Sequence, residues 1–290
     1  MDTIKQLPGE WRQWILDNLA LGCSHASMVE AMARRDFDRE FAAHCVRLLS
    51  AGEPVAVVAE DAAMSAARPA YVDEPPRIRY QGSVIHADGR EVRLRLRLAQ
   101  PVLAVLDGLL SAGECEELIR QSRIKLSRST IVDPHSGREE VIGERSSEGA
   151  FFRVDENEFL AGLDRRIAAV MNWPVENGEG MQILRYGIGG EYQPHFDYFA
   201  PSDPGSQVHL AQGGQRVSTL VMYLNDVPAG GETVFPELQL AVVPRQGSAV
   251  YFEYCNSLSQ VDRRTLHGGL PVQSGEKWIA TKWMRQRRYG

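Results

Sequence analysis

The sequence predicts an α+β protein, in which a small helical module precedes a larger domain of the β-sandwich or β-barrel type with flanking helices. Two observations predict this fold. Residues 1–65 place apolar side chains at helical intervals, with almost no β-branched alternation. After residue 180, short segments rich in β-branched and aromatic residues are separated by glycine, proline and aspartate. This second pattern favours a sandwich or barrel over βαβ units.

The N-terminal module is expected to contain three helices. One apolar face begins at Trp11, and a second runs through Met28, Met32, Phe37, Phe41, Cys45 and Leu48. Gly22 and Gly52 mark helix ends, because glycine commonly terminates helices. Pro69, Pro75 and Pro76 then stiffen the chain, which places a domain boundary near residue 75. We therefore predict a helical module over 1–75, which either packs as a structural unit or docks a partner, and a second domain over 76–290.

The segment before residue 180 is expected to supply a hairpin, a strand and two helices. Asp88-Gly89 is a favoured two-residue hairpin turn between alternating strands. A strand from residue 101 leads into a helix whose predicted N-cap is Ser111, with Glu114 at the capping-box spacing. Residues 127–150 are polar and rich in glycine, which predicts a mobile loop that could serve as a lid. Residues 156–172 return to helical spacing.

Composition narrows the function classes. The 290-residue chain is 43% apolar and 24% charged, as in ordinary globular proteins, and its net charge of −6 disfavours nucleic-acid binding. It contains no apolar run long enough to cross a membrane and no signal-peptide pattern at its start. The four cysteines are scattered, which fits a reducing compartment. We therefore expect a cytoplasmic protein that binds neither nucleic acid nor membrane.

The segment MQILRYGIGGEYQPHFDYF contains the most informative motif. In an extended strand His195 and Asp197 point to the same face, and His267 on another predicted strand offers a third ligand. Two histidines and one carboxylate with open positions opposite are typical of non-haem Fe(II) oxygenases. The spacing alone is weak evidence, since His86 and Asp88 repeat it at the hairpin turn, where the aspartate suits the turn.

Lys277 follows His267 by ten residues, within the predicted strand KWIATKWMRQ. If it faces the barrel interior, its ammonium needs an anion, and a dicarboxylate co-substrate would supply one. The alternative is an exposed lysine, because Lys282 lies on the opposite face of the strand and one of the two is expected to point outward.

These residues lie within blocks that resemble the prolyl 4-hydroxylase branch of the 2-oxoglutarate/Fe(II)-dependent dioxygenases over residues of about 100–287. The blocks are PVLAVLDGLLSAGECEELI, the HFD strand, GGQRVSTLVMYLNDVPAGGETVFPEL, GSAVYFEY and LHGGLPVQSGEKWIATKWMR. The resemblance implies a double-stranded β-helix, or jelly-roll, as the core of the domain. It also implies Fe(II), with 2-oxoglutarate and O2 as co-substrates and ascorbate as the reductant.

The resemblance assigns roles position by position. His195, Asp197 and His267 match the iron ligands. Lys277, Tyr186 and Thr233 match the groups that bind the distal carboxylate of 2-oxoglutarate, and Tyr192, Arg216 and Trp283 match positions on the side of the peptide substrate. From the residues alone, Tyr186 and Trp283 could be barrel packing, Thr233 a turn hydroxyl, and Arg216 the partner of an acid.

The implied activity is hydroxylation of a C–H bond, foremost C4 of proline in a peptide or protein, with release of succinate and CO2. Two alternatives remain open at this point. The same chemistry could act on a free amino acid or another small molecule. The protein could also be an oxygen-sensing or binding module of slow turnover, with the N-terminal helices as its effector or docking part.

Overall fold

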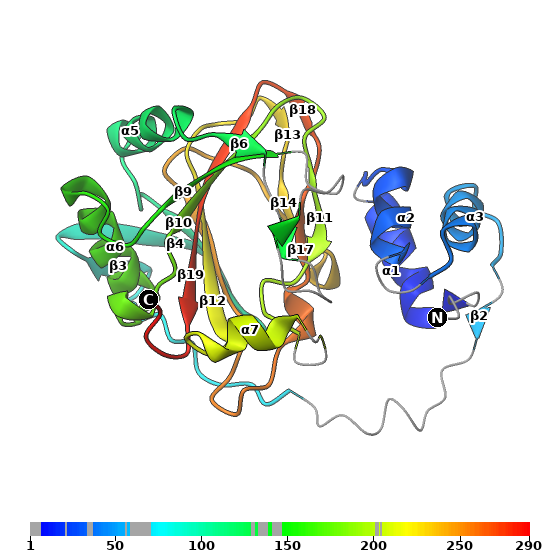
Figure 1. Ribbon diagram of the computed structural model, residues 1–290, viewed down its shortest axis with the longest axis horizontal. Helices are drawn as coiled ribbons and strands as arrows, with labels where there is room; N and C mark the ends of the chain where they lie inside the picture. Colours follow the sequence, from blue (N-terminus) through cyan, green and yellow to red (C-terminus); the bar gives the residue numbers. More distant parts are fainter. Residues whose placement is uncertain are drawn as a thin grey trace.

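Figure 1 shows the computed structural model of the chain. The structure describes residues 7–20, 22–33, 37–55, 57–58, 71–128, 131–132, 139–140, 147–200, 203 and 205–290. Two hydrophobic cores form, one within the N-terminal helices and one within the β-rich part. No helix in these described ranges is long and apolar enough to cross a membrane.

The N-terminal module contains the three predicted helices, α1 (Gly9–Ala20), α2 (His25–Ala33) and α3 (Arg39–Ser50). Short strands β1 (Leu7–Pro8) and β2 (Val57–Val58) pair in parallel beside them. Asp38 begins α3 by accepting a 2.9 Å hydrogen bond from the Phe41 amide. Their shared apolar residues form a core of their own: Leu7, Ile15, Met28, Met32, Phe37, Ala42, Cys45, Val46 and Leu49. The division at residue 75 stays a prediction, and Val72 already hydrogen bonds to Gln260 and Asn256 of the β-rich part.

The β-rich part is built on a major sheet of nine antiparallel strands in the order β3-β4-β5-β16-β12-β19-β10-β9-β6. The strands are β3 (Val84–Ala87), β4 (Arg90–Ala99), β5 (Val102–Asp107), β6 (Ser127–Arg128), β9 (Ser147–Phe152), β10 (Met181–Tyr186), β12 (Arg216–Tyr223), β16 (Ala249–Glu253) and β19 (Lys277–Arg285). Asp88 and Gly89 both have positive φ, as the predicted hairpin turn requires.

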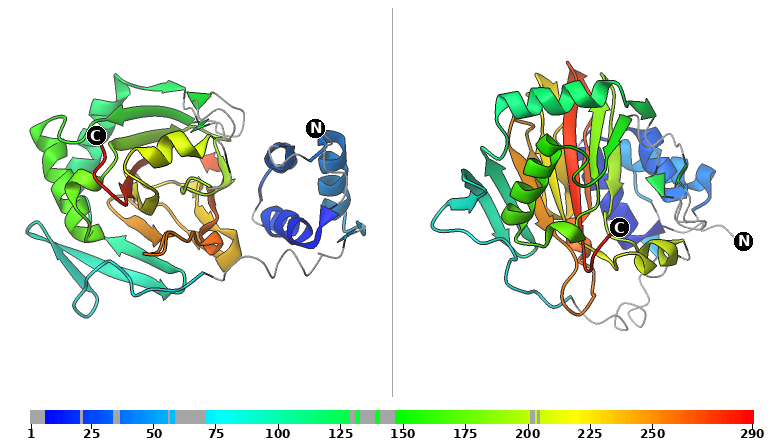
Figure 2. Two further views of the ribbon diagram at one scale, coloured as in Figure 1. Left: turned by 60° about the horizontal axis from the view of Figure 1, so that its bottom comes forward. Right: turned by 60° about the vertical axis from the view of Figure 1, so that its left-hand side comes forward.

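A minor sheet in the order β11-β17-β14-β15 lies opposite the major sheet, and the two together form the jelly-roll core (Figure 2). Its strands are β11 (Tyr192–His195), β14 (Thr233–Phe235), β15 (Leu240–Val242) and β17 (His267–Gly269), and β13 (Ala229–Gly230) pairs with β18 (Val272–Ser274) nearby. The short helix η2 (Pro236–Leu238) follows β14. This arrangement confirms the predicted α+β jelly-roll class.

Helices α5 (Ala112–Arg123) and α6 (Glu158–Met171) pack against strands of the major sheet on the side away from the minor sheet (Figure 1). The Ser111–Glu114 capping box at the start of α5 is present as predicted. The predicted loop over 127–150 is wrong in part. Ser127–Arg128 and Ser147–Phe152 are sheet strands, and β7 (Ile131–Val132) pairs with β8 (Glu139–Glu140), while the rest of the segment lies outside the described residues.

The four cysteines are free thiols. Cys45, Cys115 and Cys255 are buried and Cys23 is half-buried. Burial raises the pKa of Cys115 and Cys255 to about 11, and burial together with the charge of Glu191 raises that of Cys23 to about 12. At neutral pH these thiols are therefore protonated.

Candidate metal centre and co-substrate pocket

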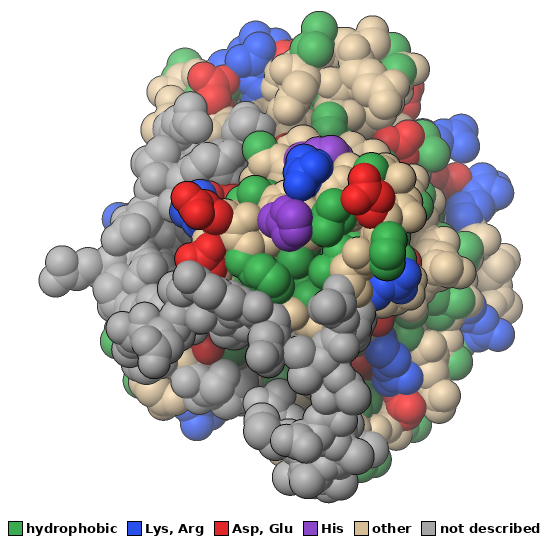
Figure 3. Space-filling model, turned by 90° about the vertical axis from the view of Figure 1, so that its right-hand side faces the viewer, with side chains coloured by type: hydrophobic (Ala, Val, Ile, Leu, Met, Phe, Trp, Pro, Cys, Tyr) green, Lys and Arg blue, Asp and Glu red, His purple; other side chains and the backbone are tan. Residues whose placement is uncertain are grey.

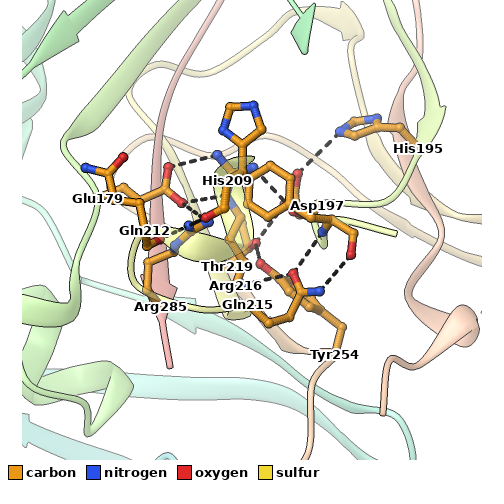
Figure 4. Close-up of polar contacts among 11 residues, drawn as sticks. Glu179, His195, Asp197, His209, Gln212, Gln215, Arg216, Thr219, Tyr254 and Arg285 are labelled. Atoms are coloured by element: carbon orange, nitrogen blue, oxygen red, sulfur yellow. Dashed lines mark hydrogen bonds and ion pairs between the residues drawn. The ribbon is translucent and has the colours of Figure 1, made fainter. Parts of the chain in front are cut away.

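Two histidines and an aspartate meet between the two sheets. His195 at the end of β11 pairs directly with His267 at the start of β17, and Asp197 follows His195 by two residues. The Nε2 atom of His195 lies 3.6 Å from Asp197 Oδ1, and Nε2 of His267 lies 3.5 Å from Asp197 Oδ2. One ligand atom of each residue falls within 4.8 Å of the others, as required to hold a single ion (Figure 4 shows His195 and Asp197).

The surrounding hydrogen bonds leave the Nε2 atoms of the two histidines free to face the space where an ion would be held. His195 Nδ1 lies 2.7 Å from the Gln193 carbonyl, and His267 Nδ1 lies 3.0 Å from the Thr265 carbonyl. Because a carbonyl only accepts, each Nδ1 carries the hydrogen and each Nε2 presents a lone pair. Thr219 Oγ1 donates a 2.7 Å bond to Asp197 Oδ2. The donor set and its orientation therefore fit Fe(II).

The charge states suit a metal site as well. Burial lowers the pKa of His267 to about 4, so its ring is neutral at physiological pH. Burial alone would raise the pKa of Asp197, but His267, His195 and Arg216 outweigh it and hold this carboxyl well below its usual range. The centre thus offers one negative charge from Asp197 and a neutral nitrogen from His267.

Lys277 lies in a pocket beside this centre. It is the first residue of β19, pairs with Tyr186 of β10, and is only 3% exposed. Its Nζ lies 5.6 Å from the centroid of the Tyr186 ring, and within the described residues it has no hydrogen bond or ion pair. Burial lowers its pKa to about 8, which the charge of Glu232 only partly offsets. A buried ammonium without an anion is costly, so this pocket suits a carboxylate.

Two glycines keep the pocket open. A Cβ atom at Gly231 would lie 3.3 Å from Lys277 Cδ, and one at Gly269 would lie 3.5 Å from Lys277 Nζ. Gly231 also has a φ of +73°, which other residues rarely adopt. A side chain at Gly231 would therefore press on the lysine, whereas a Cβ at Gly269 would lie at ordinary contact distance from it.

Thr233, at the start of β14, is buried opposite Gly269 in the minor sheet. The hydroxyl of Tyr223 donates a 2.8 Å hydrogen bond to Thr233 Oγ1. Tyr223 is not among the residues predicted from the sequence, although the period-two spacing of Thr219, Val221 and Tyr223 on β12 places all three side chains on one face. Tyr223 therefore orients a hydroxyl that the sequence analysis had named.

Arg216 forms an ion pair with Glu179, which is the alternative role that the sequence had suggested for it. Its Nε and Nη2 atoms donate to both carboxylate oxygens of Glu179 at 2.7 and 2.8 Å, and Nη1 donates to the Asp197 carbonyl at 3.3 Å. Its guanidinium lies 4.1 Å from the centroid of the Trp283 ring. The predicted contacts of Arg216, Trp283 and Tyr192 with a peptide stay predictions.

A second buried arginine extends this network to the segment after Asp197 (Figure 4). Arg285, 1% exposed, donates to the carbonyls of His209 and Gln212 at the end of α7 (Ser206–Ala211) and to Glu179 at 3.3 Å. The Gln215 side chain hydrogen bonds to the backbone of Phe199 twice. Its Oε1 accepts from the Phe199 amide at 2.8 Å, and its Nε2 donates to the Phe199 carbonyl at 2.7 Å. Arg285 and Gln215 therefore fix the chain on the C-terminal side of the ligand Asp197.

The prediction that one of Lys277 and Lys282 points to solvent is wrong. Lys282 is 1% exposed and donates a 2.6 Å bond to Asp164 Oδ1 of α6. Both faces of β19 are covered, one by the minor sheet and the other by helices, so alternation does not bring either lysine to water. Lys282 is neutralised by a carboxylate 118 residues away, whereas Lys277 is not.

Comparisons with known proteins agree with this geometry. Residues 181–285 match the 2OG-Fe(II) oxygenase superfamily. The chain is 37% identical over 209 residues to probable prolyl 4-hydroxylase 3 of Arabidopsis thaliana, covering 66% of this chain and 71% of that protein. It is 41% identical over 202 residues to prolyl 4-hydroxylase 1 of the same plant, covering 64% and 70%.

Among solved structures, the viral collagen prolyl hydroxylase of Paramecium Bursaria Chlorella virus-1, in its 2OG complex, is 30% identical with a TM-score of 0.50. The match covers 63% of this chain and 95% of the viral one. From the His-Asp-His centre, the lysine pocket and these relatives we conclude that the chain belongs to the prolyl 4-hydroxylase family of 2OG-Fe(II) oxygenases.

Proposed function

We propose that the protein hydroxylates proline residues of peptides at C4, consuming 2-oxoglutarate and O2 and releasing succinate and CO2. The observation that carries this proposal is the His195–Asp197–His267 centre beside the buried, unpaired ammonium of Lys277. The first provides an iron site, and the second provides a site for a carboxylate within the same cavity. The family membership supplies proline as the target.

The ligand residues have separate tasks in this reaction. His195, Asp197 and His267 would hold Fe(II), which when bound supplies the oxidative chemistry at the C–H bond. The Thr219 hydroxyl, which lies 2.9 Å from the Tyr254 hydroxyl, fixes one oxygen of Asp197. The carbonyls of Gln193 and Thr265 fix the tautomers of the two histidines, so that the ligand atoms need little rearrangement.

The co-substrate would be anchored by its distal carboxylate. Lys277 would pair with that carboxylate. The Thr233 hydroxyl accepts a hydrogen bond from Tyr223, so it could donate its own hydrogen bond to that carboxylate. Tyr186, buried next to Lys277, would complete the pocket. The anion restores a charge partner to Lys277, so binding favours the protonated lysine.

The peptide would approach from the side of Tyr192 and Trp283. The Tyr192 ring stacks on His195 with 3.7 Å between ring centroids, so it lies directly beside the iron ligand. Aromatic faces suit proline rings, as in other proline-binding proteins. Since Glu179 already satisfies Arg216, that arginine would act by holding Trp283 and the Asp197 backbone in place.

The working environment is part of the same proposal. Ascorbate is the expected reductant that keeps iron in the Fe(II) state. The four free cysteines, none of which forms a disulfide, support a reducing compartment such as the cytoplasm.

The test is succinate formation by the purified full-length chain with Fe(II), 2-oxoglutarate, ascorbate and air. Three arms contain a proline-rich peptide, free proline, or neither. We expect peptide-dependent succinate and a mass increase of one oxygen on proline. His267→Ala should abolish this activity, whereas His86→Ala, at the similar His-x-Asp sequence of the hairpin, should retain it. Turnover with free proline alone would identify a small-molecule hydroxylase instead.

A further inference from the structure

The helical module lies beside the sheet that carries the metal ligands (Figures 1 and 2). Helix α2 contacts β11, and helix α1 contacts η2. β11 contains Tyr192 and His195, and η2 directly follows the strand that begins with Thr233. The module therefore contacts segments next to both the predicted peptide side and the predicted co-substrate pocket.

Among the described residues, a polar contact links the start of α2 to the residue just before β11. Ser24, which directly precedes α2, donates from Oγ to Glu191 Oε1 at 3.3 Å. The same hydroxyl accepts a bond from the Ser27 amide at 3.2 Å, and Ser27 Oγ donates to the Ser24 carbonyl at 2.7 Å. The first turn of α2 thus fixes the serine, and the positive end of the helix dipole favours a carboxylate there.

Glu191 is partly withdrawn from water at this contact. Burial raises its pKa above the usual range, although the bond from Ser24 lowers it. The negative charge of Glu191 also contributes to the raised pKa of the neighbouring Cys23 thiol. Glu191 is therefore the half-buried side of this contact, and Ser24 is its exposed side.

The contact bears directly on the site because of where Glu191 lies in the chain. It precedes Tyr192, whose ring stacks on the His195 imidazole at 3.7 Å with 24° between the planes. Within the described part of the chain β11 is an edge strand that pairs only with β17, and its register is irregular between Tyr192 and His195. Pro194 removes one amide from that short strand. A short, irregular edge strand of this kind is held in place more firmly when another element packs against it.

We propose that the helical module is a positioning element of the peptide site, and that the Ser24–Glu191 contact holds β11 so that Tyr192 stays against His195 on the side where the peptide binds. Glu191 is thus a positioning residue for an extended, proline-containing polypeptide substrate. The co-substrate pocket, which is built on β10, β14 and β19, does not depend on this contact. The inference rests on the proposed function for its substrate.

The test is a double-mutant cycle with Ser24→Ala, Glu191→Gln and the double variant in the full-length, iron-loaded protein. Ser50→Ala is the matched control, because Ser50 is exposed on α3 and bonds only to the Arg47 carbonyl of its own helix within the described residues. We expect each single variant to raise the peptide KM about three- to tenfold, which corresponds to the loss of a hydrogen bond to a charged group. The double variant should be no worse than either single one, and the KM for 2-oxoglutarate should stay unchanged.

A second readout does not need turnover. Amide hydrogen exchange at residues 191–195 should quicken in Ser24→Ala and Glu191→Gln but not in Ser50→Ala, at unchanged melting temperature. Additive effects in the cycle, or exchange at β11 equal to that of the unmodified protein, would overturn the inference. If no peptide supports turnover by the unmodified protein, the proposed function fails, and the exchange experiment still decides whether the contact positions β11.

The surface on this side gives no simple electrostatic alternative. Figure 3 shows the molecule from the side of the helical module, where acidic and basic side chains are interspersed among the coloured atoms. Increasing salt should accordingly change the peptide KM of the unmodified protein only modestly.

Discussion

The Tyr223 hydroxyl donates to Thr233 Oγ1 at 2.8 Å, and both groups are buried within the jelly roll. Since the threonine oxygen accepts this bond, its own proton is left for a further acceptor. This arrangement turns an ordinary strand hydroxyl into an oriented donor next to Lys277. Tyr223 is therefore expected to contribute to co-substrate binding without being a ligand of the metal.

Removing this hydroxyl gives the first prediction. Tyr223→Phe should raise the KM for 2-oxoglutarate about three- to tenfold, because Thr233 loses the bond that orients it. Succinate release at varied 2-oxoglutarate measures the change. Tyr80→Phe is the control, since Tyr80 carries its hydroxyl on the outer side, where Arg97 donates to it. An unchanged KM in Tyr223→Phe would show that this hydrogen bond does not contribute to co-substrate binding.

The lowered pKa of Lys277 gives the second prediction. The ammonium binds a carboxylate only while it is protonated, and its pKa without that partner is about 8. Affinity for 2-oxoglutarate should therefore fall as pH rises above about 8, and binding at pH 8 should take up protons. Calorimetry in buffers of different ionisation enthalpy measures this uptake. Lys277→Met should weaken binding below about pH 8, where the lysine is protonated, and abolish the uptake, whereas the same uptake in that variant would place the titrating group elsewhere.

The buried Lys282–Asp164 pair gives the third prediction. Asp164→Asn leaves a buried ammonium without its counter-charge and should lower the free energy of unfolding by about 3–5 kcal/mol. Lys282→Met combined with Asp164→Leu should recover most of this loss, because neither charge is then buried. Urea titration measures both. Glu156→Gln, which breaks the more exposed pair with Lys125, should cost less than about 1 kcal/mol.

The links of Arg285 to α7 give the fourth prediction. Arg285→Lys keeps the charge, but its donors sit on a single nitrogen and cannot span His209, Gln212 and Glu179 as the two terminal nitrogens of the guanidinium do. Hydrogen exchange over residues 205–212 should therefore quicken, while exchange in α5 stays unchanged. Arg288→Lys, an exposed position near the C-terminus, is the control. Unchanged protection of α7 would show that its other contacts suffice.

The parts of the fold that depend on near neighbours could be predicted from the sequence. The Asp88-Gly89 turn and the Ser111–Glu114 capping box are fixed by residues within four positions of each other, and both are present. The spacing of His195 and Asp197 predicted that the two side chains lie together, and they do, although β11 ends at His195 and Asp197 lies in the bend that follows it rather than on the strand. His267 could be offered as a third ligand from its place on another predicted strand, but its pairing with His195 could not be predicted, because the two residues are more than seventy positions apart.

The remainder depends on contacts that no local pattern encodes. The strand at Ser147–Phe152 is polar and glycine-containing, and it forms because β10 and β6 pair with it on both sides. Lys282 is buried because Asp164 arrives from α6. Arg216 could be weighed as an ion-pair partner, but Glu179 could not be identified until the sheet brought it there.

The buried cysteines have a consequence for an enzyme that consumes O2. Oxidation of cysteine proceeds through the thiolate, and the raised pKa values leave very little thiolate at neutral pH. The thiols are therefore expected to resist oxidation under air, and added thiol reductants should do little to prolong the active lifetime of the protein. Loss of activity during turnover is then expected to originate at the iron rather than at sulfur.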